Sequence, residues 1–186
     1  MTHTEAPSIA EMPTWSDVAG GALLGVAGVV IVAVATPDYA GVLAAPLTLA
    51  GVLAMIDQRT THIATVHAGL LAAVTILACG IGIAVYRGSW SALIAGAAVW
   101  TLPLFLLAVF AGFGGGDFKY AFSLGAATGW VSVSCSITGL LLSLLLASGA
   151  GLAVAALRHS TRAQVPLGVP LFVAAVLAVA LQAVVA

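Results

Sequence analysis

Two aspartates, Asp57 and Asp117, are the residues best placed to do chemistry, because each one abuts a long apolar segment. An ionisable side chain at membrane depth is costly to bury and usually marks a functional site. Two aspartates held close together cannot both ionise cheaply, so such a pair shares one proton. One carboxylate can then take a proton from water while the other donates a proton to a carbonyl, as carboxylate-catalysed hydrolysis requires.

The remaining polar residues offer less. Four further carboxylates lie in a polar tail or a turn, and we expect them to be solvated: Glu5, Glu11, Asp17 and Asp38. His62 and His67 follow Asp57 but have no acidic or cysteine partner that would complete a metal site. Cys79 and Cys135 each lie alone in an apolar run, so they form neither a zinc site nor a disulfide framework. We therefore expect no metal and no cofactor.

Composition places these aspartates in a membrane protein. Of the 186 residues, 62% are hydrophobic and only 6% are charged, whereas a soluble domain carries about 25% charged residues. Apolar runs follow one another from residue 18 to the C-terminus, so lipid is the expected solvent. The net charge of −1 and the lack of a basic patch give no reason to expect nucleic acid as a partner. The fold class predicted is an all-α, polytopic transmembrane helix bundle.

The apolar runs divide the chain into six spans and one shorter segment. Because about 20 residues cross the hydrocarbon, we place the spans at 18–36, 39–57, 63–86, 89–111, 132–157 and 166–186. The apolar piece at 118–131 is either a half-helix or a seventh crossing. Residues 1–17 form a polar tail, and 18–186 form a single transmembrane domain. We expect the first span to be retained, although Ala33-Val34-Ala35 resembles a cleavage site and leaves its removal as an alternative.

The basic residues predict the orientation. If 118–131 crosses the membrane, four of them lie on one side and one on the other: Arg59, Lys119, Arg158 and Arg162 against Arg87. This imbalance predicts that the side with four is cytoplasmic. Trp90 and Trp130 then fall on the opposite surface, where indoles prefer the headgroup level. Asp57 and Asp117 fall together on the cytoplasmic face.

Glycines mark where backbones can approach closely. Gly21 and Gly25, and again Gly125 and Gly129, have the four-residue spacing that lets membrane helices come together. The run Gly114-Gly115-Gly116 directly precedes Asp117. Glycine permits approaches that a Cβ forbids, so this run can bring the carboxylate against a neighbouring backbone. A flexible turn between helices explains the run about as well.

Three ordered motifs resemble the type IV prepilin peptidase family, which includes the archaeal preflagellin peptidases and belongs with the GxGD aspartic proteases. The matching residues are Asp57, Arg59 and Ile63 in the first motif, Gly114, Gly116, Asp117, Lys119 and Leu124-Gly125-Ala126 in the second, and Pro166-x-Gly168-x-Pro170 in the third. Together they cover roughly residues 40–186. The chain departs from the family pattern at Ala64-Thr65, where Pro-Asn is usual, and at Leu167 and Val169.

The resemblance implies a membrane-embedded aspartic endopeptidase that cleaves the short leader of prepilin-like precursors at the cytoplasmic face of the cell membrane. The substrate would carry a hydrophobic N-terminal helix. The catalytic residues implied are Asp57 and Asp117, with support or substrate contacts from Gly114, Gly116, Lys119 and Arg59. Lys119 and Arg59 could equally anchor their helix ends at the membrane surface. The cysteine-rich domain of the larger bacterial enzymes is absent, so the implied form is a peptidase without N-methyltransferase activity.

Two other classes of function stay open. A transporter or proton-conducting subunit would also use intramembrane carboxylates, but an ion pathway needs charges at several depths. A catalytically silent relative that packs with partner helices is the other alternative, and the Ala64-Thr65 pair is its best support. The particular substrate and the oligomeric state do not follow from the sequence.

Overall fold

The structure is a computed structural model that describes residues 14–60, 63–86, 88–111, 115–158 and 166–185. Within those ranges the chain forms seven α-helices and no strand. They are α1 (Trp15–Ala35), α2 (Pro37–Thr60), α3 (Thr65–Tyr86), α4 (Trp90–Ala111), α5 (Gly115–Val131), α6 (Val133–Arg158) and α7 (Gly168–Val185). The predicted all-α helix bundle is confirmed.

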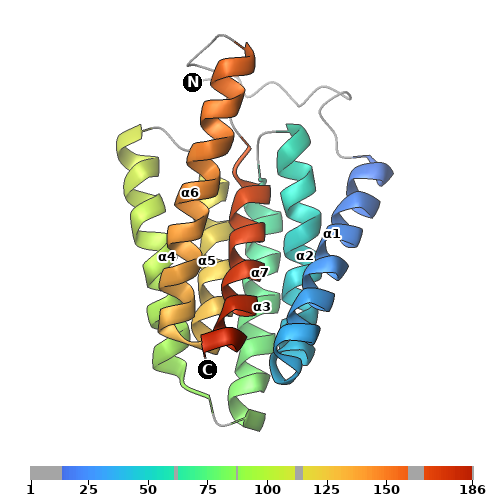
Figure 1. The fold of residues 1–186 in the computed structure, drawn as a ribbon, viewed down its shortest axis with the longest axis vertical. Helices are drawn as coiled ribbons and strands as arrows, with labels where there is room; N and C mark the ends of the chain where they lie inside the picture. The colour runs from blue at the N-terminus through green and yellow to red at the C-terminus, as the bar shows by residue number, and fades with distance from the viewer. Residues whose placement is uncertain (1–13, 61–62, 87, 112–114, 159–165, 186) are drawn as a thin grey trace.

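Successive helices run in alternate directions along one bundle axis (Figure 1). Five of them are long and apolar enough to cross a membrane: α1, α2, α3, α4 and α6. The apolar part of α7, Gly168–Gln182, is shorter. The spans predicted from hydropathy appear as helices whose ends are shifted. Gly, Pro and polar residues separate one helix from the next.

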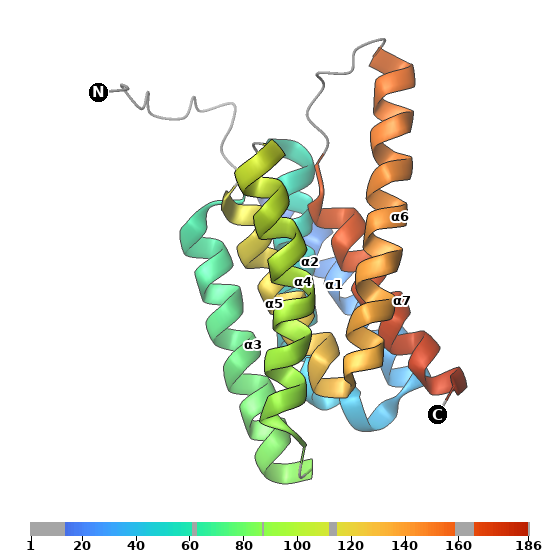
Figure 2. The ribbon, with the colours of Figure 1, turned by 90° about the vertical axis from the view of Figure 1, so that its left-hand side faces the viewer.

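Helix α5 contains the segment 118–131 whose extent was left open. It runs along the bundle and connects the end where α4 finishes to the end where α6 starts, so it is not a half-helix (Figures 1 and 2). It has only 17 residues, and nearly all residues from Tyr120 to Trp130 are buried. Because neighbouring helices rather than lipid surround it, its length need not match the hydrocarbon thickness.

Helix α1 starts inside the segment predicted as the polar tail. The tail was placed at 1–17, but the helix begins at Trp15. The Asp17 carboxylate accepts a hydrogen bond from the backbone N–H of Thr14, with 2.7 Å between the nitrogen and Oδ2. A side chain that reaches back to the residue before the helix satisfies an N–H that lacks an intrahelical acceptor. Hydropathy could not locate this start, since the capping residues are polar.

Glycine contacts hold two pairs of helices close together. Gly25 packs so tightly on α2 that a Cβ built there would lie 2.5 Å from Thr48 Cα. In the second pair, a Cβ on Gly129 would lie 2.7 Å from the carbonyl oxygen of Ala92 and the Cα of Gly96. The close approach predicted from the glycine spacing is therefore confirmed for α1 against α2 and for α4 against α5.

The prediction for the two tryptophans is half wrong. Trp90 is 51% exposed at the start of α4, as expected of an interfacial indole. Trp130 is only 7% exposed, and its ring packs edge-on against Tyr39 with 5.4 Å between centroids. A Cβ on Gly82 would lie 2.7 Å from the Trp130 ring. Sequence position placed Trp130 at the correct end, but the small residue on α3 lets the ring turn into the bundle.

Candidate functional site

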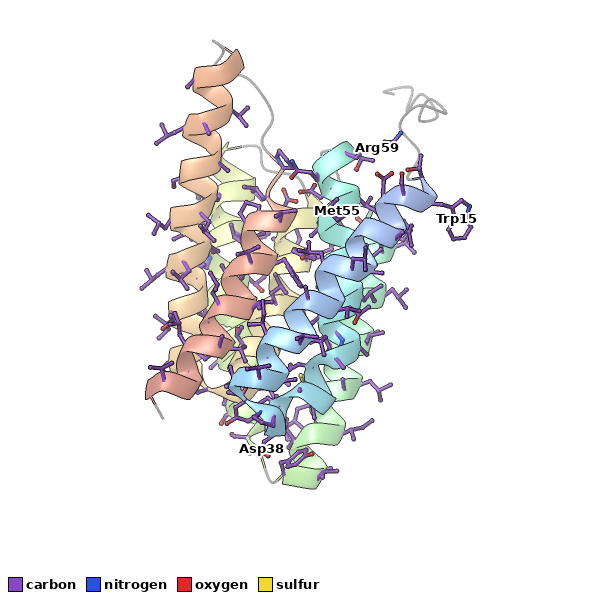
Figure 3. All side chains as sticks on the ribbon, turned by 45° about the vertical axis from the view of Figure 1, so that its right-hand side comes forward. Trp15, Asp38, Met55 and Arg59 are labelled. Atoms are coloured by element: carbon purple, nitrogen blue, oxygen red, sulfur yellow. The ribbon has the colours of Figure 1, made fainter. Side chains whose placement is uncertain are left out.

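Residues from all three sequence motifs lie at one end of the bundle, where α2 finishes and α3, α5 and α7 begin (Figure 1), whereas Leu124-Gly125-Ala126 of the second motif lie further along α5. Figure 3 shows Arg59 at this end of α2 and Asp38 at the far end. The helix directions explain why these residues lie together, because α2 runs toward this end while α3, α5 and α7 run away from it.

Asp57 is the buried carboxylate of this end, at 2% exposure in the last turn of α2. Its Oδ2 accepts a hydrogen bond from the backbone N–H of Gly168, 2.7 Å away. Gly168 is the first residue of α7, and the first N–H groups of a helix have no acceptor within it. Asp57 supplies that acceptor, and the partial positive charge of the helix N-terminus favours a carboxylate there.

Gly168 also fits the space that α2 leaves. A Cβ added to it would lie 2.9 Å from Ala54 Cα and 3.0 Å from Asp57 Cβ. Any larger residue would push the start of α7 away from α2. The third motif was recognised in the sequence without a role for its glycine, and this contact supplies one.

Asp117 is half-buried in the first turn of α5. The residue before it, Gly116, is buried against the chain just before α3, where an added Cβ would overlap the carbonyl oxygen of Ile63. This is the close backbone approach expected of the glycine run, found at Gly116. Gly114 lies outside the described residues. Ile63 belongs to the first motif and Gly116 to the second, so the two motifs are in direct contact.

Tyr120 was not predicted as a site residue. It is fully buried, and its hydroxyl donates a hydrogen bond to the carbonyl oxygen of Ala50, with 3.0 Å between the oxygens. It also interacts electrostatically with Asp57. Tyr120 therefore joins α5 to α2 one turn inside Asp117. The sequence signal that could have identified Tyr120 is its position three residues after Asp117, on the same face of the helix.

The two basic residues of the motifs contact different helices. Lys119 Nζ lies 3.4 Å from the hydroxyl of Thr65, the first residue of α3, and 5.8 Å from the centre of the Phe118 ring. Arg59 Nη1 lies 2.8 Å from Asp17 Oδ2 and 2.8 Å from Thr14 Oγ1. Asp17, expected to be a solvated tail residue, thus pairs its carboxylate with Arg59 at the surface of the bundle.

A cavity of about 260 Å³ opens beside α5, on the side of Phe118 and Lys119. Its lining is apolar apart from Thr101 and Lys119, and it comes from α3, α4 and α5: Ala68, Gly69, Ala72, Thr101, Phe118, Lys119 and Phe122. Neither aspartate lines it. The cavity is therefore a feature next to the aspartates rather than the space between them.

We looked for side chains that could form a metal site among the described residues. No group of three or more His, Cys, Asp or Glu side chains there could hold a metal ion. His67 is exposed on α3, and His62 lies outside the described residues. Cys79 and Cys135 are both buried and unpaired as thiols.

The comparison with protein families matches a segment that includes the first two motifs. The model of the type IV leader peptidase family matches residues 42–156, more than half of the chain. The chain belongs to the type IV leader peptidase family. The resemblance seen in the sequence motifs is confirmed, and the matched segment contains both Asp57 and Asp117. No curated protein and no solved structure matches the chain.

Membership in the leader peptidase family, together with five apolar candidate spans, makes this a multi-pass membrane protein with a prepilin-type leader peptidase function in general terms. The matched segment runs from α2 into α6, so α1 and α7 lie outside it. Yet α7 supplies the N–H that binds Asp57, and α1 supplies the carboxylate that binds Arg59.

Proposed function

We propose that this leader peptidase is an aspartic endopeptidase that removes the leader of prepilin-like precursors, with Asp57 and Asp117 as its catalytic pair. One observation carries the proposal. Two aspartates from different parts of the matched segment lie at the same end of the bundle, on the contacting helices α2 and α5. A transporter would be expected to carry charges at several depths, so this arrangement favours the peptidase.

The proposed chemistry needs one water and one shared proton. One carboxylate accepts a proton from the water as its oxygen attacks the scissile carbonyl carbon, and the other carboxyl donates its proton to the carbonyl oxygen. The tetrahedral intermediate then collapses, the C–N bond breaks, and the leaving amine takes up a proton. Because two interacting carboxyl groups titrate as a pair, neither aspartate is assigned as the acid or the base.

The proposed substrate is a precursor whose hydrophobic N-terminal helix lies in the membrane while the bond to be cut lies at its edge. The apolar helix is then solvated by lipid, and the cleaved bond reaches both water and the aspartates. The excess of basic residues at this end supports a cytoplasmic active site in the cell membrane. Lys119 lies beside Asp117 in sequence, where it could contact the substrate as well as Thr65.

The test is cleavage of a co-expressed prepilin-like precursor, followed by the shift in its size on a gel. Asp57→Asn and Asp117→Asn should each lower the cleavage rate by about 10²–10⁴-fold, the contribution typical of a general acid or base. Asp38→Asn removes the same charge at the far end of α2, where Asp38 is exposed, and should cleave normally.

Two outcomes would contradict the proposal. Cleavage that survives in both single variants would remove the aspartates from the mechanism. A wild-type protein that is folded but cleaves none of a panel of prepilin-like precursors would favour the catalytically silent relative, for which the Ala64-Thr65 pair is the supporting observation.

A further inference from the structure

The end of α2 that carries Asp57 is also bound on its other side by the start of α1. Arg59 Nη1 lies 2.8 Å from Asp17 Oδ2 and 2.8 Å from Thr14 Oγ1. The same Asp17 oxygen accepts hydrogen bonds from the N–H and the hydroxyl of Thr14, at 2.7 Å and 2.6 Å. We call Thr14, Asp17 and Arg59 the α1–α2 clamp. Its carboxylate is fixed by its own helix start, so Arg59 meets an acceptor that is already oriented.

Arg59 and Asp57 face different neighbours. At 3.6 residues per turn, two positions two residues apart point about 200° away from each other around the helix. Accordingly, Asp57 bonds to Gly168 of α7 and Arg59 bonds to α1. The last turn of α2 is thus held from two opposite sides.

Close packing along the two helices brings the clamp residues within reach of each other. A Cβ on Gly51 would lie 2.5 Å from Gly25 N and 2.6 Å from Gly21 O. With the backbones this close, the start of α1 lies beside the end of α2, as Figure 3 shows for Trp15 and Arg59. The family match begins at residue 42, so the clamp joins a residue of the matched segment to a helix outside it.

We propose that Arg59 is a positioning residue, which holds the Asp57 turn of α2 in register by pairing with Asp17 of α1. The proposal rests on the proposed function, since it assigns Asp57 to catalysis. Arg59 is 40% exposed and Asp17 15% exposed, and a surface ion pair adds little to global stability. Its effect should therefore appear in the rate of catalysis, where a displacement of 1 Å can lower the rate by about 10²-fold.

The experiment is a double-mutant cycle on the full chain. The variants are Asp17→Asn, Arg59→Gln and the two combined, with Asp38→Asn as a control for loss of one exposed carboxylate. For each, kcat and KM are measured with a leader-peptide substrate, and helix content and the thermal midpoint are measured by circular dichroism. Each single variant should lower kcat by about 10-fold with KM and the midpoint nearly unchanged. The double variant should be no worse than either single variant, because both remove the same interaction.

Salt and conservative substitution give a second measurement. Since an exposed ion pair is screened by salt, the kcat of the wild type should fall with ionic strength, and that dependence should be absent in Asp17→Asn. Arg59→Lys keeps the charge and should recover most of the lost kcat.

The proposal is overturned if Asp17→Asn has normal kcat while Arg59→Gln is impaired, since Arg59 would then act on something other than Asp17. Effects that multiply in the double variant would also overturn it, as would a thermal midpoint that falls in step with kcat. A failure of the proposed function is distinguishable, because Asp57→Asn would then still cleave in every one of these backgrounds.

Discussion

Asp57 takes its orientation from a residue 111 positions later in the chain. Every residue except proline would keep the N–H at position 168, but a side chain there can displace it. The absence of a Cβ is therefore the property of Gly168 that α2 requires.

Replacing Gly168 with alanine should reduce both stability and cleavage. The new Cβ would meet Ala54 Cα at 2.9 Å and Asp57 Oδ2 at 3.1 Å, and the α2 backbone cannot yield as a flexible side chain would. Overpacking of this kind costs roughly 1–3 kcal/mol, and the longer hydrogen bond should lower kcat. Thermal unfolding and the cleavage assay measure the two effects. Gly149→Ala, which meets nothing within 4 Å, is the matched control. Equal behaviour of the two variants would contradict this account of Gly168.

Residue type alone was enough to single out the two aspartates as candidates, because carboxylates are rare in this chain and costly in lipid. It was not enough to find Tyr120 or to give Gly168 a role. The Tyr120 hydroxyl meets a carbonyl 70 residues away, and such a contact is defined by the packing of α5 on α2. Arg59 shows the same limit, since its partner Asp17 lay in a segment expected to be solvated tail.

At the scale of the helices, hydropathy located six spans and the segment at 118–131, whose extent it left open, but it placed the helix ends imperfectly. The second span was predicted to end at 57, whereas α2 continues through Gln58 and Arg59 to Thr60. The fifth helix was predicted from 118 but starts at Gly115, before Asp117. Hydropathy identifies the residues that lipid can solvate. The polar helix turns that carry the candidate site lie just beyond the ends of those apolar segments.

The contact of α4 with α5 should depend on a pair of small residues. A Cβ on Gly96 would overlap Gly129 Cα and would lie 2.6 Å from the carbonyl oxygen of Gly125. Gly96→Ala should therefore destabilise the fold by roughly 1–3 kcal/mol, measured by thermal unfolding in detergent. Gly41→Ala meets nothing within 4 Å on α2 and should be neutral, or stabilising by up to about 1 kcal/mol. If the Gly96 variant were as stable as the Gly41 variant, the close contact of α4 with α5 would not contribute to the stability of the fold.

At the scale of the whole molecule, the proposed orientation rests on where the basic residues gather. Seven alternating helices place the start of α1 and the end of α7 at opposite ends (Figure 1). If the Arg59 end is cytoplasmic, a reporter fused after α7 should lie outside the cytoplasm, and one fused before α1 inside it. Enzyme reporters that work in only one compartment measure this. The reverse pattern would put the aspartates on the outer face and contradict the proposed route of the substrate.

The hydrogen bond from Gly168 to Asp57 has a consequence for biosynthesis. Of the seven helices, α7 is the last to emerge from the ribosome, and α2 is the second. While the middle of the chain is being inserted, Asp57 cannot yet form that bond, since its donor has not been translated. If Asp57 is catalytic as proposed, its carboxylate gains this donor only when insertion of α7 is complete, and a nascent chain should not yet cut neighbouring proteins at the translocon.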